Sequence, residues 1–303
     1  MMRLRGAAVV LAMLIAALAA AVAATVFADQ QRWSRMVEYR RDQVQAQALA
    51  MASIQWARQI LDDDARRSEI DHLGEPWALA LPPIPLPNGE IRGSIVDAQG
   101  RLNVNALGDA DASSASERAR IAALFAQRGG PNTALDAIAD WIDADGAVRE
   151  AGAEDAYYAA QAVPGLAANV PVLRVAELAT VKGVTPQALA AVAPYLSALP
   201  RGTPVNVNTA PAEVLAVIVD KLGADGAAAL VARRAREPYG TIAEFRSRLP
   251  KGATLSDERA LAVKSTYFYV TVEARQGATV ARARALLHRG GSEWPTIIWQ
   301  VVE

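Results

Sequence analysis

The chain has 303 residues, and its 31 lysines and arginines against 32 aspartates and glutamates give a net charge of −1. This length suits an anchor with one elaborated domain or two modest ones, and the near-neutral balance produces no global field that would attract nucleic acid. Because the chain contains no cysteine, disulfides, thiolate nucleophiles and cysteine-based zinc sites are excluded.

The N-terminus carries a membrane-spanning pattern. Two arginines precede Gly6, and residues 7–28 then run without a charge, glycine or proline until Asp29. As a helix this run would be about 33 Å long, which matches a hydrocarbon core of about 30 Å. Three interpretations fit: a plain membrane anchor, a secretory signal peptide cut after Ala28, or a pilin-type segment that is cut after Gly6 and keeps its apolar helix.

The pattern that follows favours the pilin-type segment. Residues 7–73 contain no glycine or proline, and an apolar stripe at helical spacing continues beyond residue 28. A signal peptide gives no reason for a helix to continue through its cleavage site. The sequence therefore predicts one long spine helix, with a transmembrane part at 7–28 and a soluble part at 29–73. The members of the stripe are Trp33, Val37, Val44, Ala48 and Met51.

A family resemblance appears at the start of this helix. The segment Arg-Gly-Ala-Ala-Val-Val-Leu, from Arg5 to Leu11, resembles a prepilin peptidase site. Most pilins carry glutamate at the fifth mature position, where this chain has Leu11, and the K-type minor pseudopilin is the family member that lacks it. A carboxylate in lipid is costly unless it is paired, and a subunit at the filament tip has no neighbour above it to supply the pairing amine. The chain thus resembles a K-type minor pseudopilin of the type II secretion system (general secretion pathway protein K family).

The remaining elements are predicted from pattern and turn residues. Residues 81–87 read as a stiff, extended, proline-rich connector. Residues 90–107 read as a hairpin with strands at 91–96 and 101–105. Helices are expected at 116–127, 134–142, 175–180, 186–199, 210–222, 226–236 and 241–249, and strands at 266–274, 279–288 and 297–302.

Two near-copies of an Asn-Val-Asn segment flank the helical stretch. They are Asn103–Asn105 and Asn206–Asn208, and the family shows both at matching places. Asn208 or Thr209 is well suited to cap the helix that follows, with Pro211 in its first turn.

Strands at both ends of the soluble part, with helices between them, predict an α+β fold. By resemblance this is a type IV pilin-like long N-terminal helix packed on an antiparallel sheet, with an inserted all-α domain that is SAM-like or helix-hairpin-helix-like. The predicted parts are a leader at 1–6, the transmembrane spine at 7–28, its periplasmic continuation at 29–73, the first part of the sheet at 74–107, the inserted helical domain at 108–203, and a second helical segment with the closing strands at 204–303.

One group of carboxylates is the candidate site. Asp140, Asp143, Asp145, Glu154 and Asp155 fall close together in the sequence, with glycines to bend the chain. Calcium takes six to eight oxygen ligands, although the bidentate glutamate of an EF-hand is missing at its proper offset. K-type pseudopilins bind calcium in the helical domain, so the resemblance implies a structural calcium ion at these five residues. The alternative is a set of solvated caps and turn residues.

The rival function is DNA binding at the membrane. Residues 177–184 and 222–236 each resemble half of a helix-hairpin-helix, which binds phosphate through backbone amides and nearby basic residues. No basic stripe spans both halves, so nucleic acid is not an expected partner. No phosphate loop, dinucleotide fingerprint or Gly-x-Ser-x-Gly elbow occurs, and neither His72 nor His288 has a metal-ligand spacing. No enzymatic activity is therefore expected.

The resemblance implies a role in protein export. The chain would be cleaved between Gly6 and Ala7, methylated at its new N-terminus, and held in the inner membrane by a single span with its soluble part in the periplasm. It would sit at the tip of the pseudopilus, initiate assembly, and aid export of folded proteins across the outer membrane. The expected partners are the I- and J-type minor pseudopilins, the major pseudopilin and prepilin peptidase.

Overall fold

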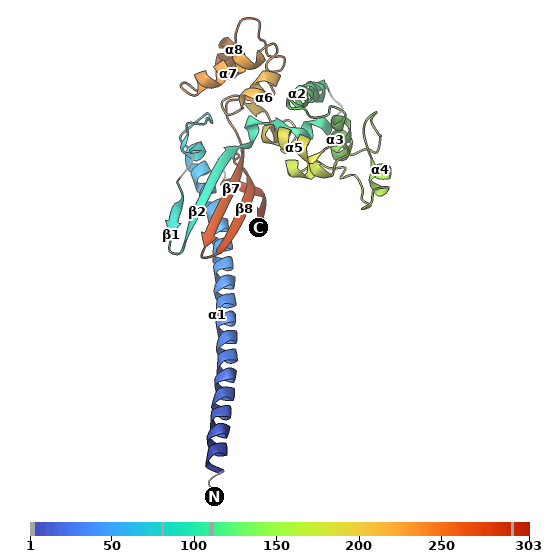
Figure 1. The fold of residues 1–303 in the computed structure, drawn as a ribbon. Coiled ribbons are helices and arrows are strands. Elements are labelled where there is room, and N and C mark those ends of the chain that lie inside the picture. Colours follow the sequence, from blue (N-terminus) through green and yellow to red (C-terminus); the bar gives the residue numbers. More distant parts are fainter. Residues whose placement is uncertain (1–3, 80–81, 109–111, 292–293) are drawn as a thin grey trace.

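The computed structural model describes residues 4–79, 82–108, 112–291 and 294–303, so residues 1–3 of the predicted leader lie outside the described residues. One helix, α1 (Leu4–Ala65), forms the spine, and its N-terminal half extends away from the rest of the protein (Figure 1). From residue 7 onward this alanine-rich helix contains no glycine or proline, which favours an unbroken helix. Among the described residues, α1 is the one helix long and apolar enough to cross a membrane.

A five-stranded antiparallel sheet packs on the C-terminal half of α1 (Figure 1). The prediction of strands at the end of the chain is confirmed, and residues 279–288 form a strand with the predicted bounds. In β7, Phe268 and Val270 are buried while Tyr267 and Tyr269 are only partly so, as the period of two requires. In spatial order the strands are β1 (Ile84–Leu86), β2 (Gly89–Asp97), β7 (Tyr267–Gln276), β8 (Thr279–His288) and β9 (Thr296–Val302).

The helix and the sheet share a core of small and branched side chains. Ala46, Ala50 and Ile54 on α1 are fully buried against β7 and β8. Alanine at successive turns lets the helix approach the sheet closely, and the larger residues of β7, Phe268 and Val270, fill the space beside the alanines of β8. The predicted stripe from Trp33 to Met51 lies elsewhere, because all five of its members are exposed.

The turn between β7 and β8 contacts α1 through a glycine. Gly277 has a φ of +55°, and a Cβ built there would lie 2.2 Å from Asp42 Oδ2. The left-handed conformation and the close approach both favour glycine over other residues.

The hairpin predicted at 90–107 is wrong. β2 pairs with β1 on one side and with β7 on the other, so its hairpin partner is the segment predicted as a stiff connector. The chain after β2 turns through a 3₁₀-helix (Ala98–Gly100) into β3 (Leu102–Asn103), which pairs in parallel with β4 (Leu196–Ser197). The strand predicted at 101–105 is correct only at Leu102–Asn103, since a 3₁₀-helix begins at Val104, and a partner distant in sequence decided the pairing.

The helical block lies beyond the end of the sheet, on the side away from the N-terminus (Figure 1). It is built as two consecutive units, each closed by a short parallel pair: β3 with β4, and β5 (Val205–Asn206) with β6 (Leu261–Ala262). One continuous apolar core runs through both units. The first unit holds α2 (Ala112–Arg128), α3 (Ala134–Ile142), α4 (Asp155–Ala159), α5 (Pro186–Val192) and 3₁₀-helices at Val104–Gly108, Val175–Thr180 and Ala193–Tyr195; the second holds α6 (Ala212–Ile218), α7 (Gly223–Arg234) and α8 (Ile242–Ser247).

The second asparagine of each Asn-Val-Asn segment makes equivalent hydrogen bonds in the two units. Asn105 bonds through its amide to both the N–H and the C=O of Val172, at 2.9 Å each. Asn208 does the same with Tyr239, again at 2.9 Å each. Each asparagine thus satisfies buried backbone groups of a distant loop. The predicted capping role of Asn208 or Thr209 is wrong, because Pro211 occupies the N-cap of α6 without a side-chain hydrogen bond.

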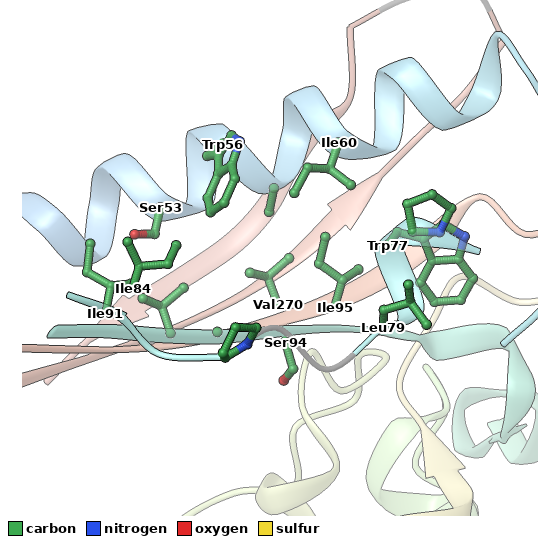
Figure 2. Close-up of a pocket in the computed structure, with 15 residues that line it drawn as sticks. Ser53, Trp56, Ile60, Trp77, Leu79, Ile84, Ile91, Ser94, Ile95 and Val270 are labelled. Atoms are coloured by element: carbon green, nitrogen blue, oxygen red, sulfur yellow. The ribbon is translucent and has the colours of Figure 1, made fainter. Parts of the chain in front are cut away.

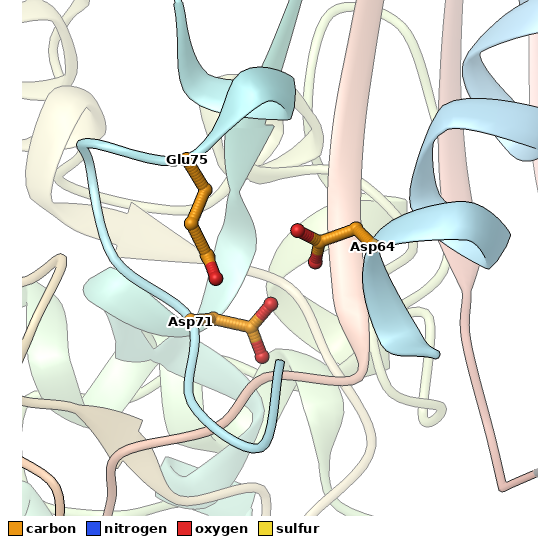
Figure 3. A group of neighbouring side chains, drawn as sticks. All are labelled: Asp64, Asp71 and Glu75. Carbon is orange, nitrogen blue, oxygen red and sulfur yellow. The ribbon is translucent and has the colours of Figure 1, made fainter. Parts of the chain in front are cut away.

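A buried arginine joins the spine, the sheet and the helical block. Arg289, in the loop after β8, donates to Asp64 Oδ2 at 2.7 Å and to Asp71 Oδ1 at 2.5 Å. Asp64 lies on the last turn of α1, while Asp71 and Glu75 lie on the following loop (Figure 3). Asp71 also accepts from the backbone N–H of Ser265, next to β7. We attribute the end of α1 at Ala65, before the predicted end at 73, to this binding of Asp71.

A narrow apolar pocket lies between α1 and the first strands of the sheet (Figure 2). Trp56 and Ile60 face it from α1, and Ile91 and Ile95 face it from β2. Its volume of about 50 Å³ leaves room for no more than a few water molecules. We regard it as a packing gap at the edge of the core.

Candidate functional site

The predicted acidic site lies where α3 ends. Asp140 is on the last turn of α3 and Asp143 is its C-cap residue, while Glu154 is the N-cap residue of α4. Asp140, Asp143 and Glu154 are 0%, 4% and 5% exposed, which is rare for carboxylates without counter-charges. The loop between the two helices carries Asp145, which is exposed.

Three of the five predicted residues converge. Carboxylate oxygens of Asp143, Asp145 and Glu154 all lie within 4.8 Å of one another. Asp143 Oδ1 and both oxygens of Glu154 are enclosed and have no hydrogen-bond partner among the described residues. Buried polar atoms are nearly always satisfied by protein, water or an ion. Oxygen-only ligands of this kind suit a hard divalent cation.

Asp140 has a different task in this site. Its Oδ1 accepts from Arg149 Nη1 at 2.6 Å and its Oδ2 accepts from the Arg149 backbone N–H at 3.2 Å. Arg149 also bonds to Asp143 Oδ2. Gly152 allows the loop to close over this pair, since a Cβ there would lie 1.8 Å from Asp140 Oδ2. Asp140 therefore orients Arg149, which in turn holds one oxygen of Asp143.

Asp155 is also engaged locally. Its Oδ1 accepts from the backbone N–H of Ala167 at 2.9 Å, which ties the loop after α4 to the start of that helix. Asp145 Oδ1 accepts from Ala147 N–H at 2.9 Å. The structure thus places Asp140 and Asp155 beside the converging oxygens, as residues that shape the surrounding loops.

Among the five predicted carboxylates, Glu154 has the clearly raised pKa. Burial raises its pKa to about 7, and the neighbouring charges of Asp140 and Asp143 add to the effect. Neither oxygen of Glu154 accepts a hydrogen bond from a described residue that would stabilise its charge. Without a cation, the ionised form of Glu154 is therefore disfavoured in the folded protein near neutral pH.

A second acidic group went unnoticed in the sequence. Asp64, Asp71 and Glu75 also bring carboxylate oxygens together, and all three are buried (Figure 3). Here the donors are present: Arg289 bonds to both aspartates, and Glu75 Oε2 accepts from His72 N–H and Trp77 Nε1. Its oxygens already have protein partners, so this group is a structural junction. Its members come from segments whose proximity only the tertiary fold creates.

Three of the basic residues in the two helix-hairpin-helix-like segments, Lys182, Arg233 and Arg234, already contact other protein groups, while Arg236 is exposed. Lys182 Nζ donates to Gly152 O at 2.8 Å. Arg234 is 5% exposed and donates to Val207 O at 2.6 Å. Arg233 pairs with Glu237. These contacts leave little for a phosphate backbone, and the comparisons below do not support the DNA-binding alternative.

Comparison with known proteins points to one family. Models of "Type II secretion system (T2SS), protein K" match residues 100–201 and 205–264, which coincide with the two helical units. The chain is 32% identical to type II secretion system protein K of Pectobacterium carotovorum, over 96% of this chain and 94% of the relative. It is 30% identical to that of Klebsiella pneumoniae, over 95% and 94% respectively.

A solved structure shares the fold. It is a chain of the GspK-GspI-GspJ complex from the enterotoxigenic Escherichia coli type 2 secretion system, with a TM-score of 0.78 and 23% identity. The match covers 88% of this chain and 99% of that one. The long helix, antiparallel sheet and helical block are therefore a shared architecture.

The raised pKa of Glu154 predicts that the free energy of unfolding depends on pH when a chelator keeps divalent cations away from the site. Its favourable contribution to folding is complete below the unfolded pKa of about 4.5 and is lost as pH rises through about 7. We expect the melting temperature of the detergent-solubilised chain to fall between pH 5.5 and pH 8. Glu154→Gln should flatten this fall and melt higher than the parent at pH 8, whereas Glu150→Gln, an exposed neighbour, should not. An unchanged slope in Glu154→Gln would contradict this account.

Proposed function

The chain belongs to the type II secretion system protein K family, and we propose that it occupies the tip of the pseudopilus, where it initiates assembly. As a member of that family it is a minor pseudopilin of type II secretion. The observation that supports the tip position is the placement of the helical block, which extends the soluble part at the end away from the N-terminus (Figure 1). A block of this size at that end suits a subunit with no subunit stacked above it.

The N-terminal half of α1 is exposed, which supports a role for it in membrane anchoring and in contacts with other subunits. Every described side chain from Ala7 to Arg41 is exposed, including Trp33 and Val37. In the inner membrane, lipid would cover residues 7–28, and the spine helices of partner subunits would cover the stripe that begins at Trp33. The soluble part would then lie in the periplasm.

The partners follow from the solved relative, whose complex contains GspI and GspJ. We propose I- and J-type minor pseudopilins as the immediate neighbours of this chain, with the major pseudopilin further along the filament. We also propose that prepilin peptidase cuts between Gly6 and Ala7 before assembly.

We further propose a structural calcium ion at the end of α3. Asp143, Asp145 and Glu154 would hold it, with Arg149 and Asp140 fixing the orientation of Asp143. The ion would bind Asp143 Oδ1 and the two oxygens of Glu154, which have no hydrogen-bond donor among the described residues. Its role would be to stabilise the first helical unit.

The function is tested by purifying the chain from membranes that also contain I- and J-type minor pseudopilins and prepilin peptidase. We expect a stoichiometric ternary complex by native mass spectrometry, with the mature chain starting at Ala7. Leu11→Glu should reduce recovery of the complex about ten-fold, because an unpaired carboxylate is costly in hydrocarbon. Leu11→Ala is the matched control and should assemble normally. A chain that purifies alone, or that starts at Asp29, would refute the proposal.

The calcium proposal is tested by thermal unfolding at pH 8 in chelator and in millimolar calcium. A cation at one hundred times its Kd adds about 2.7 kcal/mol to the free energy of unfolding, so a clear rise in melting temperature is expected. The rise should shrink below pH 7, where protons compete for Glu154. Asp143→Asn should abolish it and Glu150→Gln should retain it. No shift in the parent chain would remove the calcium site without affecting the proposed place in the pseudopilus.

A further inference from the structure

A second cleft lies between the outer face of the sheet and the first helical unit. Tyr269 and Trp299 line it from β7 and β9, and Val175 and Leu196 line it from the helical unit. Its volume is about 310 Å³, several times that of the gap beside α1. It is remote in sequence from the acidic site and is not used by the function proposed above.

The charged residues that line this cleft are all positive. Arg101, Arg174 and Arg284 contribute to its walls, and no aspartate or glutamate does so among the described residues. Arg174 is paired with Glu177 and Arg284 with Glu303. Two of the three guanidinium groups therefore have a carboxylate partner, and Arg101 is the one without an ion pair among the described residues.

Arg101 is held in place without a counter-ion. Its guanidinium carbon lies 5.5 Å from the centre of the Tyr269 ring, a cation–π contact. It forms no ion pair or side-chain hydrogen bond with the described residues. Asp97 acts on it through space, but the oxygens of that carboxylate already accept from Gln99, Asn206, Thr209 and Ser265. Burial lowers the pKa of Arg101, as expected for a cation that has lost water without gaining a carboxylate.

We propose that this cleft binds an extended acidic segment of a protein partner, with one carboxylate accepting hydrogen bonds from the Arg101 guanidinium. A planar guanidinium matches a carboxylate in two parallel hydrogen bonds. Charge complementarity thus selects an anion, and the rigid Tyr269 ring holds its donor in position.

The walls indicate a polypeptide as the carrier of that carboxylate. Apart from the arginines and Thr271, the lining consists of apolar and aromatic side chains, which suit the side chains that flank an acidic residue. The cleft also reaches β9, which forms the edge of the sheet. An edge strand offers unpaired backbone groups to an extended segment lying beside it.

The test uses the full chain in detergent, with a dye on a cysteine introduced at Ala229, an exposed position on α7 in a chain that has no other cysteine. The probe is an acetylated and amidated peptide of alternating valine and glutamate, titrated at low salt by thermophoresis. A valine–glutamine peptide, N-acetylglutamate and inorganic phosphate are titrated in parallel. We expect the glutamate peptide to bind at least ten-fold more tightly than each of the other three.

The variants separate recognition from folding. Arg101→Gln should weaken binding of the glutamate peptide about ten-fold or more, and Arg101→Lys less, because it keeps the charge. Arg92→Gln, an exposed arginine on β2 outside the cleft, should change nothing. Arg101→Gln should melt no lower than the parent, since no buried carboxylate loses its partner.

Equal affinity for the two peptides, or undiminished binding by Arg101→Gln, would overturn the proposal. Equally tight binding of N-acetylglutamate or phosphate would overturn the assignment to a polypeptide. Loss of binding in both Arg101 variants together with lower melting temperatures would show that Arg101 has a structural role, and would also overturn it.

Discussion

The arrangement of this protein depends on one buried guanidinium, that of Arg289. It is 4% exposed and joins the last turn of the spine helix, the loop that follows it, and the region where the second helical unit returns to the sheet. Removing one partner of a buried ion pair typically costs about 3–5 kcal/mol. Separating any of these three segments from Arg289 should therefore lower the free energy of unfolding by a similar amount. The pKa of Asp64 is nevertheless raised to about 6, mainly by burial. Burial thus offsets part of the stabilisation that the ion pairs provide. We infer that the main effect of the junction is on geometry, because it ends α1 and sets the position of the helical block beyond the sheet.

Much of the architecture could be predicted because its signals are local. An uninterrupted apolar run predicted α1, alternation predicted β7 and β8, and helical spacing predicted α3 with its observed bounds. The failures concern pairings between distant segments. β2 pairs with β7, and Leu102–Asn103 pairs with Leu196–Ser197 instead of folding back on β2. Asn208 likewise bonds to Tyr239, so its side chain was not available for a cap. Sequence spacing carries no information about such partners.

The acidic site was visible in the sequence because its residues come from one short segment. The sequence could not show which of these carboxylates have hydrogen-bond donors within the protein and which do not. Both oxygens of Asp140 are occupied by Arg149, and Asp155 holds a loop amide, so the oxygens without partners belong to Asp143 and Glu154. The Arg101 cleft gave no sequence signal at all, since its arginines lie far apart along the chain and meet only where the first helical unit adjoins the sheet. The cleft thus depends on how the helical block is placed against the sheet, whereas the acidic site is formed within the first helical unit.

The most direct test of this account is the distance between the spine and the helical block. Because the chain has no cysteine, spin labels can be placed at Gln59 on α1 and Gln187 on α5, both of which are exposed, and measured by double electron–electron resonance in detergent. We expect one narrow distance distribution in the parent chain and a broad one in Arg289→Met, with Arg282→Met, which loses only a surface ion pair, unchanged. A broad distribution in the parent chain, or a narrow one in Arg289→Met, would contradict the central role of the junction.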